Sequence, residues 1–141
     1  TVTVALDGAG DPILGVCVGV LAVTRESVPY RATSTDRIII VADDPALIFH
    51  VQEDALGTAL AAADVGQFVV FKVGTGSTAS GRSKWTIDTS VTPATTATYQ
   101  AWLMRLASFP DNAIGAYAVW EVMINNHQVA NIGDAGRFTA V

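Results

Sequence analysis

The sequence predicts an all-β fold, an antiparallel jelly-roll-like sandwich or barrel of about eight or nine strands. Three observations support this prediction. Apolar residues recur with a period of two in nearly every apolar segment, clusters of Gly, Pro, Asp and Ser separate these short segments, and no helices alternate with them. The 141 residues have the size of one ordinary domain, so we expect a single β domain over 1–141, with 1–11 as an extended N-terminal arm.

Nine short strands are expected along the chain. The first places Val2, Val4 and Leu6 on one face of the arm. The second, Ile13 to Val23, has no polar side chain over eleven residues, so we expect a strand buried on both faces, with Cys17 as an inert core thiol. The other seven candidates are 28–33, 37–41, 47–52, 69–73, 85–87, 99–107 and 116–125.

One segment, Asp54 to Asp64, has partly helical character. Its alanines favour a helix, but Gly57 and a weak apolar face limit the expectation to one or two turns. The sequence leaves open whether this segment is helical.

The clearest hairpin joins 99–107 to 116–125. Strict alternation predicts two sets of three apolar residues that meet in the core and bury two indoles there. The opposite face is also largely apolar, so it is either a second wall of the sandwich, a surface covered by the chain's own termini, or a subunit contact. The predicted core residues are Trp102, Met104, Leu106, Trp120, Val122 and Ile124.

Charge limits the classes of partner. Only 15% of the residues are charged, against about 25% in an average globular domain, so much of the surface is apolar or rich in Thr, Ser and Gly. Such a surface suits a protein that its partners cover. The net charge of −5 and the scattered basic residues disfavour direct binding to nucleic acid or to an anionic membrane. The longest apolar run is also too short to span a bilayer.

The sequence contains no recognisable catalytic motif. The loop Gly76 to Ser83 has the glycine spacing of a phosphate-binding loop, but Arg82 stands where that motif needs Lys, and a strand pattern follows it. His50 and His127 lie far apart and lack a further ligand at metal spacing. We therefore expect no enzyme, no catalytic residue, no cofactor and no metal, and we interpret the glycine-rich loop as a hairpin connection.

A longer pattern resembles a known family. The segment Pro110 to Gln128 (PDNAIGAYAVWEVMINNHQ), the entry Ala94 to Gln100 (ATTATYQ) and the loop Gly74 to Gly81 (GTGSTASG) occur in this order. Together with the preceding His-containing strand, they make the chain from Leu47 to Gln128 resemble the cement, or decoration, proteins of short-tailed bacteriophages such as the Bordetella phage.

That resemblance implies a structural protein that binds the outside of a tailed-phage capsid and stabilises the shell. Its partner would be the major capsid protein, its unit a homodimer, and its location the virion exterior after synthesis in the host cytoplasm. The single cysteine agrees with a reducing site of synthesis. The contact residues that we expect, at the capsid or between subunits, lie in the arm and in the loop 109–115: Val2, Val4, Leu6, Phe109, Asp111, Asn112 and Ile114.

Alternative functions remain open. The chain could be another virion component, such as a tail or major head protein. It could also be a carbohydrate-binding jelly-roll module that uses Tyr30, Trp85 or Tyr99 as stacking platforms. A small jelly-roll enzyme would need His50 close to His127 and a carboxylate.

Overall fold

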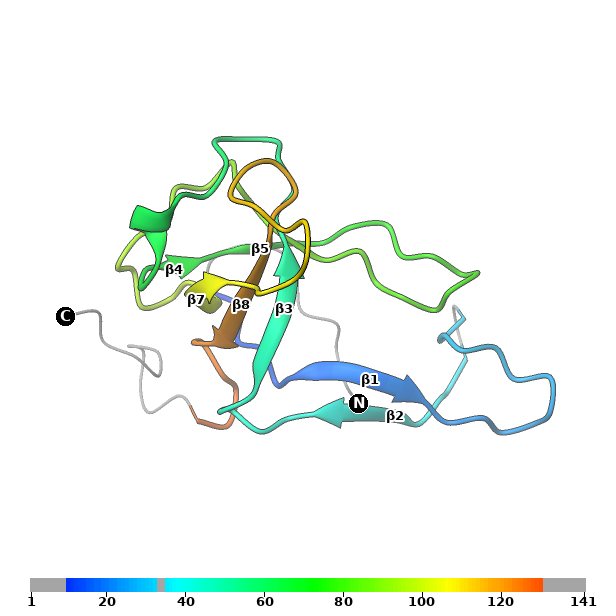
Figure 1. Ribbon diagram of the computed structural model, residues 1–141. Helices are drawn as coiled ribbons and strands as arrows, with labels where there is room; N and C mark the ends of the chain where they lie inside the picture. The colour runs from blue at the N-terminus through cyan, green and yellow to red at the C-terminus, as the bar shows by residue number, and fades with distance from the viewer. Residues whose placement is uncertain (1–9, 33–34, 131–141) are drawn as a thin grey trace.

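The computed structural model describes residues 10–32 and 35–130, and this part of the chain is all-β with antiparallel sheets (Figure 1). The predicted fold class is confirmed, and a sandwich fits the arrangement. The strand predicted in the N-terminal segment 1–11 falls outside the described residues. Residues 28–32, where another strand was predicted, form none. The strands are β1 (Val16–Val20), β2 (Ile39–Ala42), β3 (Ile48–Gln52), β4 (Phe68–Val69), β5 (Phe71–Lys72), β6 (Thr86–Ile87), β7 (Ala101–Leu106) and β8 (Val119–Ile124).

The core lies on one face of a four-stranded sheet with the order β3-β8-β7-β4. Apolar side chains of β7 and β8 meet residues of the β5–β6 pair, including Phe71 and Ile87. The Trp120 indole has no exposed surface, and its burial is one of the largest single apolar contributions to this core.

The register of β7 differs from the predicted one. Ala101 and Leu103 face the core opposite Ile124 and Val122, whereas Trp102 pairs with Met123 on the outer face. The prediction that two indoles share the core was therefore wrong.

A β-bulge explains this error. The ladder shifts between Leu103 and Arg105, and beyond the shift Leu106 pairs with Trp120 and packs against the core, as predicted. Because side chains alternate with a period of two, one extra residue exchanges the two faces. With apolar residues on both faces, the sequence pattern contains no signal that locates the bulge.

The second expected strand forms, but its predicted burial was wrong. Among the described strands, β1 pairs only with β2, and Cys17 is exposed. Val18 is 63% exposed, so β1 belongs to the surface, whereas Ile13 at the start of the run is buried in the core. An apolar run predicts a strand whose faces are buried by other residues. It does not specify whether these residues belong to the same chain or to a partner.

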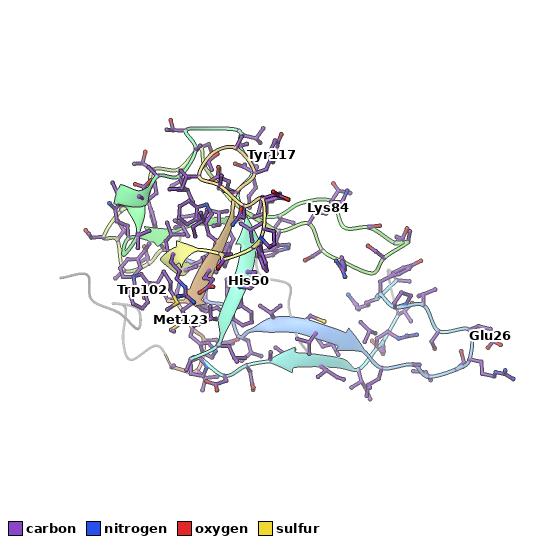
Figure 2. All side chains as sticks on the ribbon, viewed as in Figure 1. Glu26, His50, Lys84, Trp102, Tyr117 and Met123 are labelled. Atoms are coloured by element: carbon purple, nitrogen blue, oxygen red, sulfur yellow. The ribbon has the colours of Figure 1, made fainter. Side chains whose placement is uncertain are left out.

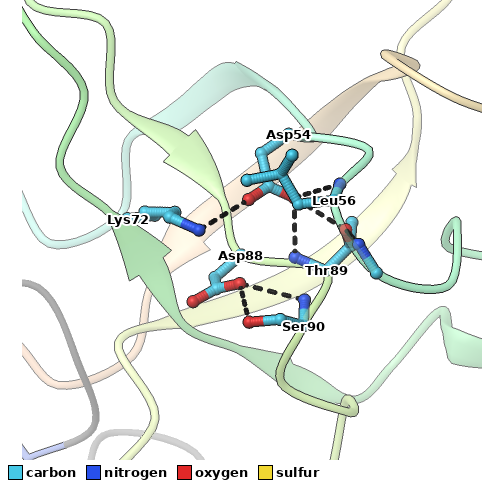
Figure 3. Close-up of polar contacts among 7 residues, drawn as sticks. Asp54, Leu56, Lys72, Asp88, Thr89 and Ser90 are labelled. Carbon is cyan, nitrogen blue, oxygen red and sulfur yellow. Dashed lines mark hydrogen bonds and ion pairs between the residues drawn. The ribbon is translucent and has the colours of Figure 1, made fainter.

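The segment that follows β3 is fixed by polar contacts (Figure 3). Its only helical turn within the described residues is the 3-10 turn η1 (Ala62–Asp64). The Asp54 carboxylate accepts hydrogen bonds from the Thr89 hydroxyl at 2.6 Å and from the backbone N–H groups of Thr89 and Leu56, and it pairs with Lys72 at 3.3 Å. Burial raises the pKa of Asp54, but these donors outweigh burial and lower it to about 2.

Candidate functional site

A group of exposed apolar side chains lies on the ribbon of β1 and β2 and its connection. We call residues 14–43, without the undescribed positions 33–34, the β1–β2 arm. It projects from the body of the molecule, and Glu26 lies at its far end (Figures 1 and 2). Segments 16–23 and 38–42 contain no charged residue. Seven large apolar side chains of the arm are exposed: Val16, Val18, Leu21, Val23, Val28, Ile38 and Ile40.

The arm is held at both ends. At its base, Gly15 lies so close to Ala42 that a Cβ atom would come within 2.1 Å of the Ala42 carbonyl oxygen. Towards its far end, the arm meets the connection between β5 and β6, where a Cβ atom on Gly81 would lie 2.7 Å from the Pro29 carbonyl oxygen. Both projections leave the body on the same side (Figure 1). The arm is therefore a positioned element with a bare apolar surface.

The β5–β6 connection is the expected hairpin loop. Phe71 pairs with Ile87 at its start, and Ser77 bridges Arg82 near its tip. Gly81 has a φ of +66°, a left-handed conformation that favours glycine. The phosphate-loop interpretation lacks its essential element, because β6 follows where a helix would be required.

An apolar slot lies between the arm and the body. Its volume is about 1190 Å³, slightly above the upper end of the usual range for ligand pockets. Its lining includes residues 11–15 and residues of β1 and β2, among them Cys17 and Ile39. Core side chains of the body also line the slot: Phe49, Val51, Phe71, Trp85 and Ile124.

Strand β3 borders this slot and is an edge strand of the sheet. Phe49 and Val51 point to the core, while His50 lies on the outer face opposite Glu121. Glu121 accepts hydrogen bonds from Arg105, which is the main reason why the pKa of Glu121 lies below its ordinary value. His50 stacks edge-on against Phe109 with ring centroids 4.8 Å apart. His50 is thus a polar residue on an edge strand.

The predicted contact residues are divided by the structure. Val2, Val4 and Leu6 lie outside the described residues. Phe109, Asp111 and Ile114 are exposed in the loop between β7 and β8.

Asn112 in the same loop has an internal role. Its side-chain amide donates to the carbonyl oxygens of Ala107 and Val119 and accepts from the Val119 N–H, at 2.7 to 3.0 Å. It therefore closes the hairpin, and its hydrogen-bonding groups are already occupied.

His50 and His127 do not form the arrangement that the enzyme alternative requires, since each contacts other residues. His127 is fully buried. One ring nitrogen contacts the Asp43 carbonyl, and the other accepts the N–H groups of Val129 and Ala130. His50 interacts instead with Glu121 and Phe109. Among residues 10–32 and 35–130, no group of three His, Cys, Asp or Glu side chains could hold a metal ion.

The proposed stacking aromatics lie on three different segments. Tyr30 is in the connection from β1 to β2, Trp85 precedes β6, and Tyr99 precedes β7; all three are half-buried. Only Trp85 lines the slot, where it packs edge-on against Phe71 at 6.2 Å.

The chain was compared with family models, curated proteins and solved structures, and it matches none of them. In the part of the chain that the structure describes, no helix has the length and apolar character needed to cross a membrane. The surface itself must therefore support any functional inference.

Sequence reasoning missed the β1–β2 arm and the slot. It placed Ile13 to Val23 in the core and did not connect this run with the apolar 38–41 segment. The absence of charge from both segments was the available signal, because a surface ribbon normally carries polar residues on at least one face.

Proposed function

We propose that this protein is a structural virion component that binds the outside of a tailed-phage capsid and stabilises the shell, with the β1–β2 arm as its main contact surface. The observation that carries the proposal is the group of six exposed apolar side chains on the charge-free segments 16–23 and 38–42: Val16, Val18, Leu21, Val23, Ile38 and Ile40.

Such a ribbon needs a partner. A two-stranded ribbon is marginally stable in water, and exposed apolar patches of this kind mark protein contacts. Protein interfaces have an apolar centre from which charge is depleted, with polar residues at the rim. The arm has this arrangement, because its strands lack charge while Arg25 and Glu26 lie in the connection between them.

A capsid is the partner that the sequence pattern favours. The resemblance to phage decoration proteins spans Leu47 to Gln128, which contains the four-stranded sheet. In this proposal the four-stranded sheet is the scaffold, and the β1–β2 arm makes the contacts with a particular shell. Many copies that each bridge capsid subunits stabilise the assembled state by mass action, even when one contact is weak.

The test is binding to purified capsids that lack this protein. Val18→Asp places a charge on the arm, and Val65→Asp is a matched control because Val65 is a 41% exposed valine outside the arm. We expect Val18→Asp to lower the apparent affinity at least tenfold, or about 1.4 kcal/mol, and Val65→Asp to bind as wild type does. Equal binding by both variants contradicts the role of the arm. If the wild-type protein does not bind capsids, or if it is recovered only with phage tails, the decoration function is contradicted.

The carbohydrate alternative has one supporting observation, the position of Trp85 in the slot. Titration with a glycan array distinguishes it from the proposal. Binding that Trp85→Ala abolishes and Val18→Asp leaves intact would favour a carbohydrate-binding module.

A further inference from the structure

The charges of this acidic chain are unevenly distributed. Segment 24–37 of the β1–β2 arm and segment 74–84 of the β5–β6 connection together carry five basic and two acidic residues. The rest of the chain carries three basic and eleven acidic residues. The two projections are therefore a region of net positive charge on a protein of net charge −5. The five basic residues are Arg25, Arg31, Arg37, Arg82 and Lys84.

The fold gathers basic residues that are scattered along the sequence. The two projections meet where a Cβ atom on Gly81 would lie 2.7 Å from the Pro29 carbonyl oxygen. Arg82 follows Gly81 directly, and Arg31 lies two residues after Pro29. Both arginines are exposed at this contact between the arm and the connection.

Arg37 is held at the same contact by a hydrogen bond. Its guanidinium group donates to the carbonyl oxygen of Val28, the residue before Pro29, at 3.0 Å. Its Nε is buried and has no hydrogen-bond partner among the described residues. We call Arg31, Arg37 and Arg82 the basic cluster, with Arg25 and Lys84 in the segments that flank it.

The charges of this region are not neutralised within the described part of the chain. Basic side chains on the body form ion pairs, since Lys72 pairs with Asp54 and Arg105 with Glu121 at 3.3 and 2.6 Å. None of the three cluster residues, and neither flanking residue, forms an ion pair with a described acidic side chain. A group of uncompensated charges on one surface attracts a partner of the opposite sign.

We propose that the basic cluster binds a carboxylate-rich surface of a protein partner beside the apolar contact of the arm. The inference rests on the proposed function and deepens it, because it gives the shell surface a chemistry: an apolar patch bordered by Asp and Glu side chains. Guanidinium groups match carboxylates with paired hydrogen bonds, and four of the five basic residues are arginines. Arginine is also enriched in protein interfaces, whereas lysine is depleted there.

The neighbouring apolar side chains favour a protein over a nucleic acid. Ile38 directly follows Arg37 and is 65% exposed, and exposed Val28 accepts the hydrogen bond from Arg37. A phosphate backbone offers charge along its whole length but no apolar area to cover these residues. A protein surface offers both.

Salt dependence of capsid binding tests the contribution of charge. The apparent affinity for purified capsids that lack this protein should fall at least about tenfold between about 0.1 M and about 1 M NaCl, because the screening length falls from about 10 Å to about 3 Å. A purely apolar contact has no charge to screen. Salt-independent binding therefore overturns this inference and leaves the apolar contact of the proposed function intact.

A matched pair of variants locates the charge. Arg82→Gln removes one charge from the cluster, and the Arg82 side chain makes no hydrogen bond within the described residues, so the melting temperature should not change. We expect binding about threefold weaker than wild type at 0.1 M NaCl and equal to wild type at 1 M. Arg105→Gln removes the same charge from the body and should bind as wild type does. Equal losses by the two variants overturn the inference, and Lys84→Gln supplies a second cluster variant if Arg82→Gln melts early.

A measurement without capsids separates this inference from the proposed function. The full chain should be retained on immobilised poly-L-glutamate at 0.1 M NaCl in spite of its net negative charge, and Arg82→Gln should elute earlier than Arg105→Gln. No retention of the wild-type chain overturns the inference. Stronger retention on immobilised duplex DNA identifies a nucleic-acid contact and also overturns it. Retention on poly-L-glutamate without capsid binding contradicts the proposed function alone.

Discussion

The Trp120 indole N–H donates a hydrogen bond to Oε2 of Glu53 at 3.2 Å, and neither residue has any exposed surface. The same carboxylate oxygen accepts the Leu60 N–H at 3.1 Å, while Oε1 is buried without a hydrogen-bond partner. A carboxylate thus lies at the centre of an apolar core. Its neighbour Asp54 also accepts hydrogen bonds, but the pKa values of the two residues shift in opposite directions.

Burial raises the pKa of Glu53, and the nearby Asp54 charge adds to this, against the opposing hydrogen bonds from Leu60 and Trp120. A raised pKa means that the contribution of Glu53 to stability is fully present at low pH and is lost as pH rises through the folded-state pKa. We expect Glu53→Gln to be at least as stable as wild type at pH 7, because an amide oxygen retains the acceptor without a buried charge. Glu53→Ala should lose about 2 to 4 kcal/mol, because it leaves two buried donors unpaired. Urea denaturation measures both, and an equal loss for the two variants contradicts this role.

Asp54 should show the opposite dependence on pH. Its pKa of about 2 lies below the ordinary value of 3.8, so its contribution is present above pH 4 and is lost as pH falls towards 2. Asp54→Asn should cost about 2 kcal/mol at pH 7 and little near pH 2, in denaturation curves measured at both pH values. Asp88→Asn is the matched control, because Asp88 bonds only to neighbouring Ser90 among the contacts in Figure 3. The same pH dependence in both variants would argue against Asp54 as its source.

The two tryptophans of the β7–β8 hairpin should differ in their effects on stability. Trp120→Ala removes a fully buried indole and should cost about 3 to 5 kcal/mol. Trp102→Ala should cost much less, because Trp102 is partly exposed beside Met123 on the outer face (Figure 2). Thermal melts of the two variants test the corrected register. A larger loss for Trp102 would restore the register expected from strict alternation.

Asn112 should act on stability and not on shell binding. Asn112→Ala removes three hydrogen bonds that close the β7–β8 hairpin and should cost about 2 to 3 kcal/mol in chemical denaturation. The exposed neighbour Ile114 provides the control, since Ile114→Ala removes none of these bonds and should leave stability nearly unchanged. A stable Asn112→Ala variant with reduced capsid occupancy would make Asn112 a contact residue after all.

The sequence by itself located most of the strands that the structure describes, because alternation and turn residues act over a few neighbouring positions, although the strand predicted at 28–33 is not formed by residues 28–32. It located β3, β8 and the Gly76 to Ser83 hairpin loop for this reason. It also indicated a surface with few charges that suits contact with partners, because the low charged fraction is a property of the composition and does not depend on the fold.

Only the tertiary structure decided which apolar residues form the core and which form the surface. Cys17 and Val18 belong to a run as apolar as any core strand, but both residues are exposed on a ribbon of two strands. Trp102 and Leu103 exchanged faces through a bulge that leaves no mark in a pattern apolar on both sides. The slot brings together residues of five strands and Trp85, and such long-range packing depends on the paths of connections that local periodicity does not encode.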